Sequence, residues 1–219
     1  MSHPCAGIEP SRFREALGHY ASGITIITTQ LDEEPIGFTC QSFYSVSMDP
    51  PLVSFSVKAG SYSYPRIRQA GRFAVNILSR DQASLSNQFA RQGDDKWRGI
   101  DWQPSPSGTP VIADCLYWLD CQIHAEHAAG DHLIVIGEVK ALKPGVTKPA
   151  PPLLYYQGQY RDLAGLDQRR CDRQTALPAP ASTSLAIPAH GWIDSENLAF
   201  SLSHRAQALF RQALALLVC

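Results

Sequence analysis

The alternation of apolar runs with turn-forming residues predicts a mainly β-structured chain. Runs rich in β-branched and aromatic residues are typical of strands, and Gly, Pro and Asp separate them here. The connections between neighbouring runs are short, which favours antiparallel pairing. Such a pattern with few helices predicts a closed or nearly closed β-barrel with helices on its outside. We expect strands at residues 24–29, 36–40, 52–57, 73–78, 116–127, 132–142 and 153–156.

Apolar residues recur at helical spacing in three short segments before residue 100. The first covers residues 11–20, with Ser11 as its candidate N-cap. We expect two further short helices at 64–70 and 81–91. Residues 93–113 are rich in Gly, Pro, Asp and Ser and are expected to form a loop.

The composition changes after about residue 163, which marks the end of the barrel domain predicted for residues 10–163. Residues 164–190 combine Arg, Asp, Gln, Pro and Ala in the manner of a linker. Residues 191–219 contain leucines at spacings of three and four, which predict an amphipathic helical tail. A lone helix cannot bury its apolar face. We therefore expect it to dock on the barrel or a partner, or to begin a truncated regulatory domain.

Composition narrows the classes of protein that the chain can belong to. It has 219 residues and a mass of 24.0 kDa, with 44% hydrophobic and 18% charged residues, so it can bury a sizeable core. A net charge of −1 argues against general binding to nucleic acid. No apolar run is long enough for a membrane span and no secretory signal is visible. Six cysteines without a C-x-x-C pair indicate reduced thiols in the cytosol.

Two polar stretches carry candidate binding chemistry. Residues 37–51, GFTCQSFYSVSMDPP, are rich in small hydroxyls and backbone amides that suit a phosphate or a flavin ribityl chain. Their alternative interpretation is an edge strand and turn rich in Ser and Thr. Residues 56–63, SVKAGSYS, offer the Lys58 charge and two serine hydroxyls after a buried strand. The alternative there is an ordinary turn. Neither a P-loop nor a G-x-G-x-x-G fingerprint occurs in the chain.

Three histidines are candidates for chemistry on the two longest strands. His132 follows the turn Gly130-Asp131 and is expected near a barrel rim, where it either faces a ligand or is a bystander. His124 and His127 are three residues apart, so they point to opposite faces of one strand and do not share a metal ion. We therefore expect no metal site.

Seven fragments taken together resemble the flavin reductase-like family with the FMN-binding split-barrel fold. The resemblance runs from Phe13 to Leu163, and the fragments occur in the family's order. They are FREALGHYASGITIITT, GFTCQSFYSVSMDPPLVSFSV, FAVNIL, LSNQFA, DKWRG, GDHLIVIGEV and PLLYYQGQYRDL.

The resemblance implies a split β-barrel with flanking short helices that pairs as a homodimer, with flavin in a groove near the dimer interface. Similar members are reductase components of two-component flavin monooxygenases, such as the hydroxyphenylacetate hydroxylase reductase. The implied activity is reduction of FMN or FAD by NADH or NADPH in the cytoplasm. The implied partner is a separate oxygenase that receives the reduced flavin.

The resemblance also implies roles for individual residues. His132 matches the histidine that borders the nicotinamide, and we expect it to position that ring. Negative charge developing on the flavin is expected to meet backbone amides of the 37–47 or 55–58 segment. The residues implied to bind flavin are Thr39, Cys40, Gln41, Ser42, Ser45, Ser47, Phe55, Ser56, Val57, Lys58, Ser61, Ser63, Asn87, Phe89, Arg91, Tyr155 and Tyr160, with Tyr156 in the same closing segment.

Two other functions remain open on the same fold. A flavin-binding electron carrier would keep its FMN tightly and would not oxidise NADH. A regulatory or binding module would use the C-terminal helix, because SENLAFSLSHRAQALFRQALALL resembles the first helix of the MarR-like domain that some such reductases carry.

Overall fold

The structure is a computed structural model that describes residues 7–93 and 95–163. The predicted linker at 164–190 and the predicted helical tail at 191–219 lie outside the described residues. Within the described ranges, no helix combines the length and the apolar character that crossing a membrane requires.

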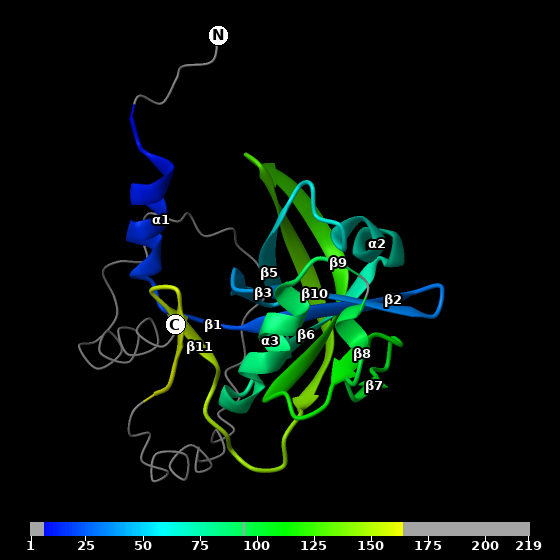
Figure 1. Cartoon of the computed structure of the whole chain (residues 1–219). Helices are drawn as coiled ribbons and strands as arrows, with labels where there is room; N and C mark the ends of the chain where they lie inside the picture. The colour runs from blue at the N-terminus through cyan, green and yellow to red at the C-terminus, as the bar shows by residue number, and fades with distance from the viewer. Residues whose placement is uncertain (1–6, 94, 164–219) are drawn as a thin grey trace, which may run out of the picture. The chain divides into compact units, whose positions relative to one another are not determined.

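A seven-stranded antiparallel sheet forms the body of the domain (Figure 1). Its spatial order is β3-β2-β6-β9-β10-β5-β4. The long hairpin of β9 and β10 lies at its centre, and its register contains two irregularities. The bounds of its strands are β2 Thr25–Leu31, β3 Glu34–Cys40, β4 Phe43–Met48, β5 Pro51–Lys58, β6 Arg72–Ile77, β9 Tyr117–Ala129 and β10 His132–Pro144.

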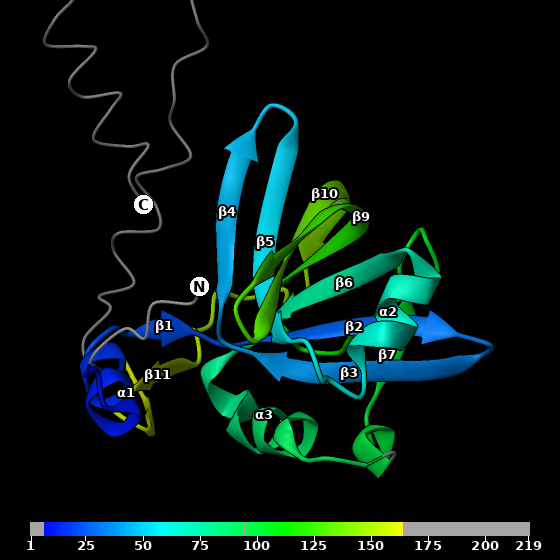
Figure 2. The ribbon, with the colours of Figure 1, turned by 90° about the horizontal axis from the view of Figure 1, so that it is seen from above.

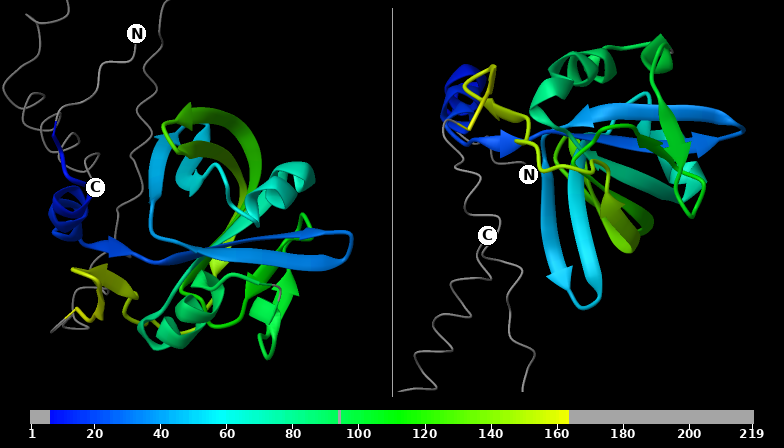
Figure 3. Two further views of the ribbon diagram at one scale, coloured as in Figure 1. Left: turned by 45° about the horizontal axis from the view of Figure 1, so that its top comes forward. Right: turned by 90° about the horizontal axis from the view of Figure 1, so that it is seen from below.

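The sheet curves into a split barrel because its two edges are neighbours in sequence. Strands β3 and β4 lie at opposite edges of the sheet, yet only Gln41 and Ser42 separate them. Two residues span only about 7 Å, so the sheet must bend until the end of one edge meets the start of the other. The edges form no ladder with each other, so the barrel is not fully closed and the expected split barrel is confirmed (Figure 3).

Among the described residues, three helices, two 3-10 turns and two small sheets surround the seven strands (Figure 2). One small sheet has the order β1-β11-β12 and lies beside helix α1, whose end accepts a hydrogen bond from the Gln157 backbone N–H at 3.0 Å. The other pairs β7 with β8. The elements are α1 Pro10–Gly18, α2 Tyr64–Ala70, α3 Ala83–Ala90, η1 Arg80–Gln82, η2 Asp95–Trp97, β1 Ser22–Gly23, β7 Trp102–Pro104, β8 Pro110–Ile112, β11 Leu154–Tyr156 and β12 Gln159–Arg161.

Two local predictions need correction. Helix α1 begins one residue earlier than expected, because the Glu9 carboxylate, and not Ser11, caps it and accepts from the Ser11 backbone N–H at 2.9 Å. The segment 93–113 was expected to be a loop but contains a β-hairpin of β7 and β8. Its strands are only three residues long, too short for a period of two to be recognised in the sequence.

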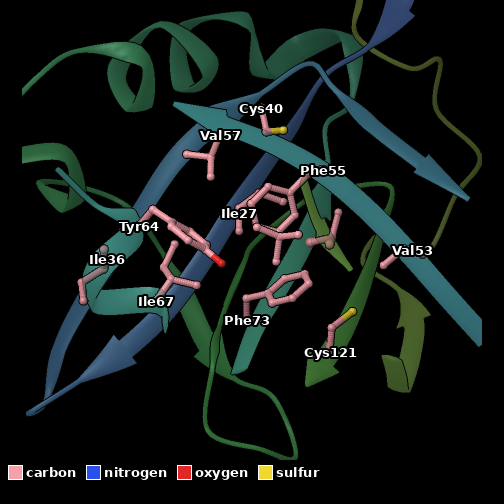
Figure 4. Packing of buried hydrophobic residues seen from close by; sticks show 12 residues of the cluster. Ile27, Ile36, Cys40, Val53, Phe55, Val57, Tyr64, Ile67, Phe73 and Cys121 are labelled. Atoms are coloured by element: carbon pink, nitrogen blue, oxygen red, sulfur yellow. The ribbon is translucent and has the colours of Figure 1, made fainter. Parts of the chain in front are cut away.

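The main core lies inside the curved sheet and is closed at one end by α2 (Figure 4). The Phe73 ring packs edge-on against Phe55 with centroids 5.2 Å apart. Tyr64 and Ile67 enter the same cluster from α2. These large buried side chains give the domain most of its stabilising apolar contact and make the barrel wall rigid.

Candidate functional site

One end of the barrel collects the ends of three strands. Strand β3 ends at Cys40, β5 ends at Lys58 and β10 begins at His132. Lys58 and His132 lie directly opposite each other in the β5–β10 ladder. The turn before His132 is also attached to β5, because the Asp131 carbonyl accepts from the Ala59 N–H at 3.0 Å. The sheet register therefore brings together segments that are more than seventy residues apart in sequence.

Ser42 ties the corner between β3 and β4 to the end of β5. Its hydroxyl donates to the Ser56 carbonyl at 2.9 Å and accepts from the Ser56 N–H at 3.0 Å. The Cys40 carbonyl accepts from the Thr25 hydroxyl at 3.0 Å, which holds the start of the same corner. Because both Ser42 bonds are internal, this hydroxyl shapes the corner and leaves Gln41 as its exposed polar side chain.

Helix α3 is attached to the same barrel end by polar contacts. The Thr39 hydroxyl donates to the Ser86 carbonyl at 2.6 Å. On the other side of α3, the Tyr160 hydroxyl lies 2.8 Å from Asn87 Oδ1 and 3.0 Å from Ser86 Oγ. The Tyr155 ring packs on Tyr160 with centroids 5.5 Å apart. Four of the predicted residues, Thr39, Asn87, Tyr155 and Tyr160, thus belong to one connected cluster.

A groove of about 1180 Å³ opens beside this corner, and we call it the tyrosine groove. Helix α1, the corner between β3 and β4, and the β11–β12 turn form its walls. Gln41, Ser42 and Tyr155 are predicted residues that line it, and Tyr20 and Tyr44 line it as well. Aromatic walls with the Gln41 amide at one side suit a flat heteroaromatic ring with polar edges.

A second groove of about 730 Å³ lies where α2, β3 and residues 93, 96 and 97 meet, and we call it the arginine groove. Its charged side chains are Arg66, Glu34 and Lys96. Of the predicted flavin residues only Ser63 lines this groove.

The electrostatics of this barrel end favour a neutral Cys40 thiol and a fixed His132 imidazole. The hydrogen bond from His132 lowers the pKa of the Asp131 carboxyl, so Asp131 is anionic at neutral pH. Asp131 Oδ1 lies 2.7 Å from His132 Nδ1, which leaves Nε2 free of this contact. Burial raises the pKa of the Cys40 thiol, so Cys40 is a protonated, unreactive wall residue. Burial also raises the pKa of Tyr44, with a contribution from the neighbouring Tyr20.

Some predicted residues lie in the core instead. Phe55 and Phe89 are 1% and 0% exposed, so their side chains pack inside the protein and offer no surface to a flavin. Phe89 presses against Gly37, where a Cβ atom would lie 2.7 Å from its ring. Val57 is also buried, which leaves only the backbone of this strand end for a ligand. At these three positions the side chains pack in the core, and the flavin contacts implied for the residues stay predictions.

The remaining predicted residues lie at the edges of the site. Ser45 and Ser47 are on the edge strand β4, on either side of an irregularity in its pairing with β5. Ser61 accepts from the Tyr64 N–H at 3.3 Å in the loop that leads to α2. Arg91 is the exposed residue that ends α3.

Two groove residues were missed by sequence reasoning, namely Tyr20 and Tyr44. Both lie inside fragments that carry the family resemblance, FREALGHY and GFTCQSFY. Tyr20 follows α1 and Tyr44 is the second residue of β4, so only the folded chain shows that they share a groove.

The histidines of β9 do not form a metal centre in the part of the chain that the structure describes. His124 and His127 are both exposed. Glu126, which lies between them, accepts hydrogen bonds from the Tyr64 hydroxyl and from Arg68 Nε, the latter at 3.0 Å. The Arg68 hydrogen bond is the main reason why the pKa of Glu126 is lowered.

Comparison with known proteins places this chain in one family. The model of the flavin reductase like domain matches residues 17–164. The reductase subunit HsaB of a flavin-dependent monooxygenase from Mycobacterium tuberculosis is 43% identical over 158 residues, which cover 72% of this chain and 84% of HsaB. The FMN reductase (NADH) SmoA of Agrobacterium fabrum is 45% identical over 134 residues, which cover 61% of this chain and 76% of SmoA.

A solved structure agrees with these sequence matches. The NADH:FAD oxidoreductase SgcE6 of Streptomyces globisporus C-1027, in complex with NAD and FAD fragments, superposes with a TM-score of 0.68 at 30% identity. The match covers 75% of this chain and 100% of that chain. The split barrel, the family match over residues 17–164 and these relatives show that the chain belongs to the flavin reductase-like family of oxidoreductases, which use flavin and NADH.

Proposed function

We propose that this protein reduces FMN or FAD with NADH or NADPH and supplies the reduced flavin to a separate monooxygenase component. The observation that carries the proposal is the meeting of Gln41, Ser42, Lys58 and His132 at one barrel end beside the tyrosine groove. The relatives named as reductase subunits of monooxygenases support the same activity. We also propose that the enzyme works in the cytosol, since its three described cysteines are all free and buried.

The residues present fit a flavin. The walls of the tyrosine groove suit its ring, and Lys58 and Ser61, three residues apart, suit its phosphate. When bound, the flavin supplies the capacity to accept a hydride from the nicotinamide. Gln41 and the backbone amides of the strand ends donate to the polar edge of the ring and stabilise negative charge there.

His132 is assigned to positioning the nicotinamide. Its Nδ1 is held by Asp131, so the imidazole orientation is set before a ligand binds and Nε2 is the remaining polar atom of the ring. The proposed pocket contains few charged clamps, which is consistent with moderate flavin affinity and with release of the product to a partner.

Anaerobic mixing of the purified protein with NADH and excess FMN tests the proposed activity. We expect bleaching of the flavin absorbance with many turnovers for each protein molecule. Flavin-loaded protein that does not oxidise NADH or NADPH would contradict the proposal and would favour an electron carrier.

Replacement of His132 by alanine should raise the KM for NADH by about tenfold, because one oriented polar contact to the nicotinamide is lost. The Kd for FMN should change less than twofold. Steady-state kinetics and flavin fluorescence titration measure the two quantities. His127→Ala removes an exposed histidine from the neighbouring strand and should change neither. Equal losses in NADH and flavin binding would refute the assignment of His132.

We propose further that the protein is a homodimer. The edge strand β4 exposes Tyr44, Val46 and Met48 to 47%, 49% and 78%, and α1 has no buried residue at all. Phe13 and Leu17 of α1 are also more than half exposed. Contiguous exposed apolar side chains of this size mark a protein interface. A second copy of the chain would cover them and would narrow the tyrosine groove that lies between α1 and β4.

Val46→Glu should convert the dimer to a monomer, because a buried unpaired carboxylate destabilises the interface by several kcal/mol, about 3 or more. Sedimentation equilibrium should give a mass near that of the 24.0 kDa chain for this variant and twice that mass for the wild type. Leu142→Glu changes an exposed residue of β10 and serves as the control. A wild-type monomer, or a Val46→Glu dimer, would disprove the proposed interface.

A further inference from the structure

We propose that the arginine groove binds the adenosine phosphate end of a dinucleotide, and that FAD is the dinucleotide it favours. The inference rests on the proposed function, since it extends the flavin site beyond the phosphate that FMN and FAD share. It makes the protein a reductase with a separate subsite that discriminates FAD from FMN.

The arginine groove is connected by a short loop to the proposed site of the flavin phosphate. The loop 59–63 starts after Lys58, at the barrel end that holds His132. It leads directly to Tyr62 and Ser63, which line the arginine groove. The Ser61 N–H donates to the Lys58 carbonyl at 2.9 Å, so this connection is a tight turn. A ligand whose first phosphate lies at Lys58 and Ser61 therefore has its next groups directed along the loop toward the groove.

The charge of the groove suits a phosphate. Arg66 and Lys96 supply two cations and Glu34 one anion, so the lining carries a net positive charge. The Arg66 guanidinium pairs with Glu34, and the Lys96 ammonium donates to the Gly37 carbonyl at 3.3 Å. The Arg66 side chain is 30% exposed and that of Glu34 is 70% exposed, so an anion can reach the guanidinium and compete with the carboxylate.

The apolar part of the groove suits a base. Tyr62 lines it and is 65% exposed, so its ring is accessible for contact with a base. Trp97 also lines the groove, and its buried indole N–H has no hydrogen-bond partner among the described residues. The Trp97 side chain adds a second aromatic wall beside Tyr62. The volume of about 730 Å³ lies within the range of nucleotide-sized pockets.

Variants of Arg66 and of Glu34, compared with each other, distinguish a role of this ion pair in phosphate binding from a role in stability alone. If the pair only stabilised the fold, Arg66→Gln and Glu34→Gln would have effects of the same sign. If the groove binds phosphate, Arg66→Gln removes the cation that binds it, whereas Glu34→Gln removes the anion that competes for this cation. The two variants should then change the FAD affinity in opposite directions.

The experiment is a fluorescence titration of the full-length chain with FAD, FMN and ADP. We expect Arg66→Gln to weaken FAD by about tenfold and Glu34→Gln to strengthen it by about threefold, while both leave FMN within twofold. ADP should bind the wild type and lose affinity in Arg66→Gln. Arg68→Gln is the matched control: Arg68 lies on the same helix and pairs with Glu126, outside the groove, so its FAD affinity should stay at the wild-type value.

A kinetic measurement distinguishes FAD from NADH as the source of the adenosine phosphate. With FMN as the flavin, an unchanged KM for NADH in Arg66→Gln assigns the groove to FAD. A tenfold rise in this KM with unchanged FAD affinity would overturn the preference for FAD and assign the groove to the nicotinamide dinucleotide.

Results that contradict an adenosine phosphate site in the arginine groove differ from results that contradict flavin reduction. Equal effects of Arg66→Gln on FMN and FAD, effects of one sign from both variants, or no binding of ADP would overturn the inference while the protein still reduces flavin. Absence of binding to either flavin in the wild type would instead overturn the proposed function.

Discussion

Gly137→Ala should lower the free energy of unfolding by about 3 kcal/mol, because the added methyl group has no space. A Cβ atom at this position would lie 2.3 Å from Cζ of Phe73 and 3.3 Å from the Cβ of Cys121. Phe73 has no exposed surface and packs against Phe55, so its ring cannot move aside without disturbing the core. Gly137 follows directly on a register irregularity between β10 and β9, where the two strands bend together.

A smaller side chain at Phe73, the residue that the new methyl group would strike, tests this explanation. Phe73→Leu alone should cost about 1–2 kcal/mol, because it removes ring contacts from a packed core. In Gly137→Ala with Phe73→Leu, the smaller side chain leaves room for the methyl group. The double variant should therefore be more stable than the sum of the two single effects predicts, by about 1–2 kcal/mol. Urea denaturation of the four proteins measures this coupling, and strict additivity would contradict the proposed clash.

Asp120→Ala should cost about 3–4 kcal/mol of stability, because it removes a buried carboxylate that accepts three hydrogen bonds. Asp120 lies on β9 and is 1% exposed. Its carboxylate accepts from the N–H and hydroxyl of Ser107 at 2.9 and 2.6 Å, and from the Thr109 hydroxyl at 3.2 Å. These three bonds fix the turn between β7 and β8 on the barrel wall.

Asp120→Asn tests whether the charge or only the shape is needed. It keeps one acceptor oxygen and the volume, so we expect an intermediate loss of about 1–2 kcal/mol. Asp101→Ala removes an exposed carboxylate nearby in sequence and should cost less than about 0.5 kcal/mol. Thermal unfolding followed by circular dichroism ranks the three variants. A loss from Asp120→Ala no larger than that from Asp101→Ala would mean that the network adds nothing to stability.

Stability and function should respond independently to these changes. Gly137 and Asp120 line neither groove. Below the melting temperature, each variant should therefore bind FMN within about twofold of the wild type, because distant sites with no shared partners combine additively.

Much of the fold was predictable because its elements are encoded locally. The β-branched run at 24–29 became the buried part of β2, and helix α2 occupies the predicted residues 64–70. The turn at Gly130 and the two long strands around it were also predicted, since a glycine with positive φ allows a tight hairpin.

The candidate site was predicted less evenly, and burial explains the difference. Ser42 bonds to Ser56 near the end of β5, and Lys58 at that end lies opposite His132, whereas the roles that the family resemblance implies for them stay predictions. Phe55 and Phe89 belong to the same fragments but turn inward, because a strand alternates its faces and a helix has one buried stripe. A sequence motif therefore does not distinguish a residue that contacts the ligand from a buried residue that packs behind the site.

By itself the amino-acid sequence determined most of the strand and helix positions through local periodicity, and the split-barrel class and the family through fragments in a fixed order. Only the tertiary structure decided which residues share a surface. Tyr20 meets Tyr44 in one groove, and Arg66 meets Glu34 in the other, across separations that no local pattern encodes. The reason is physical: strand order and sheet curvature, set by packing of the whole core, bring distant segments into contact.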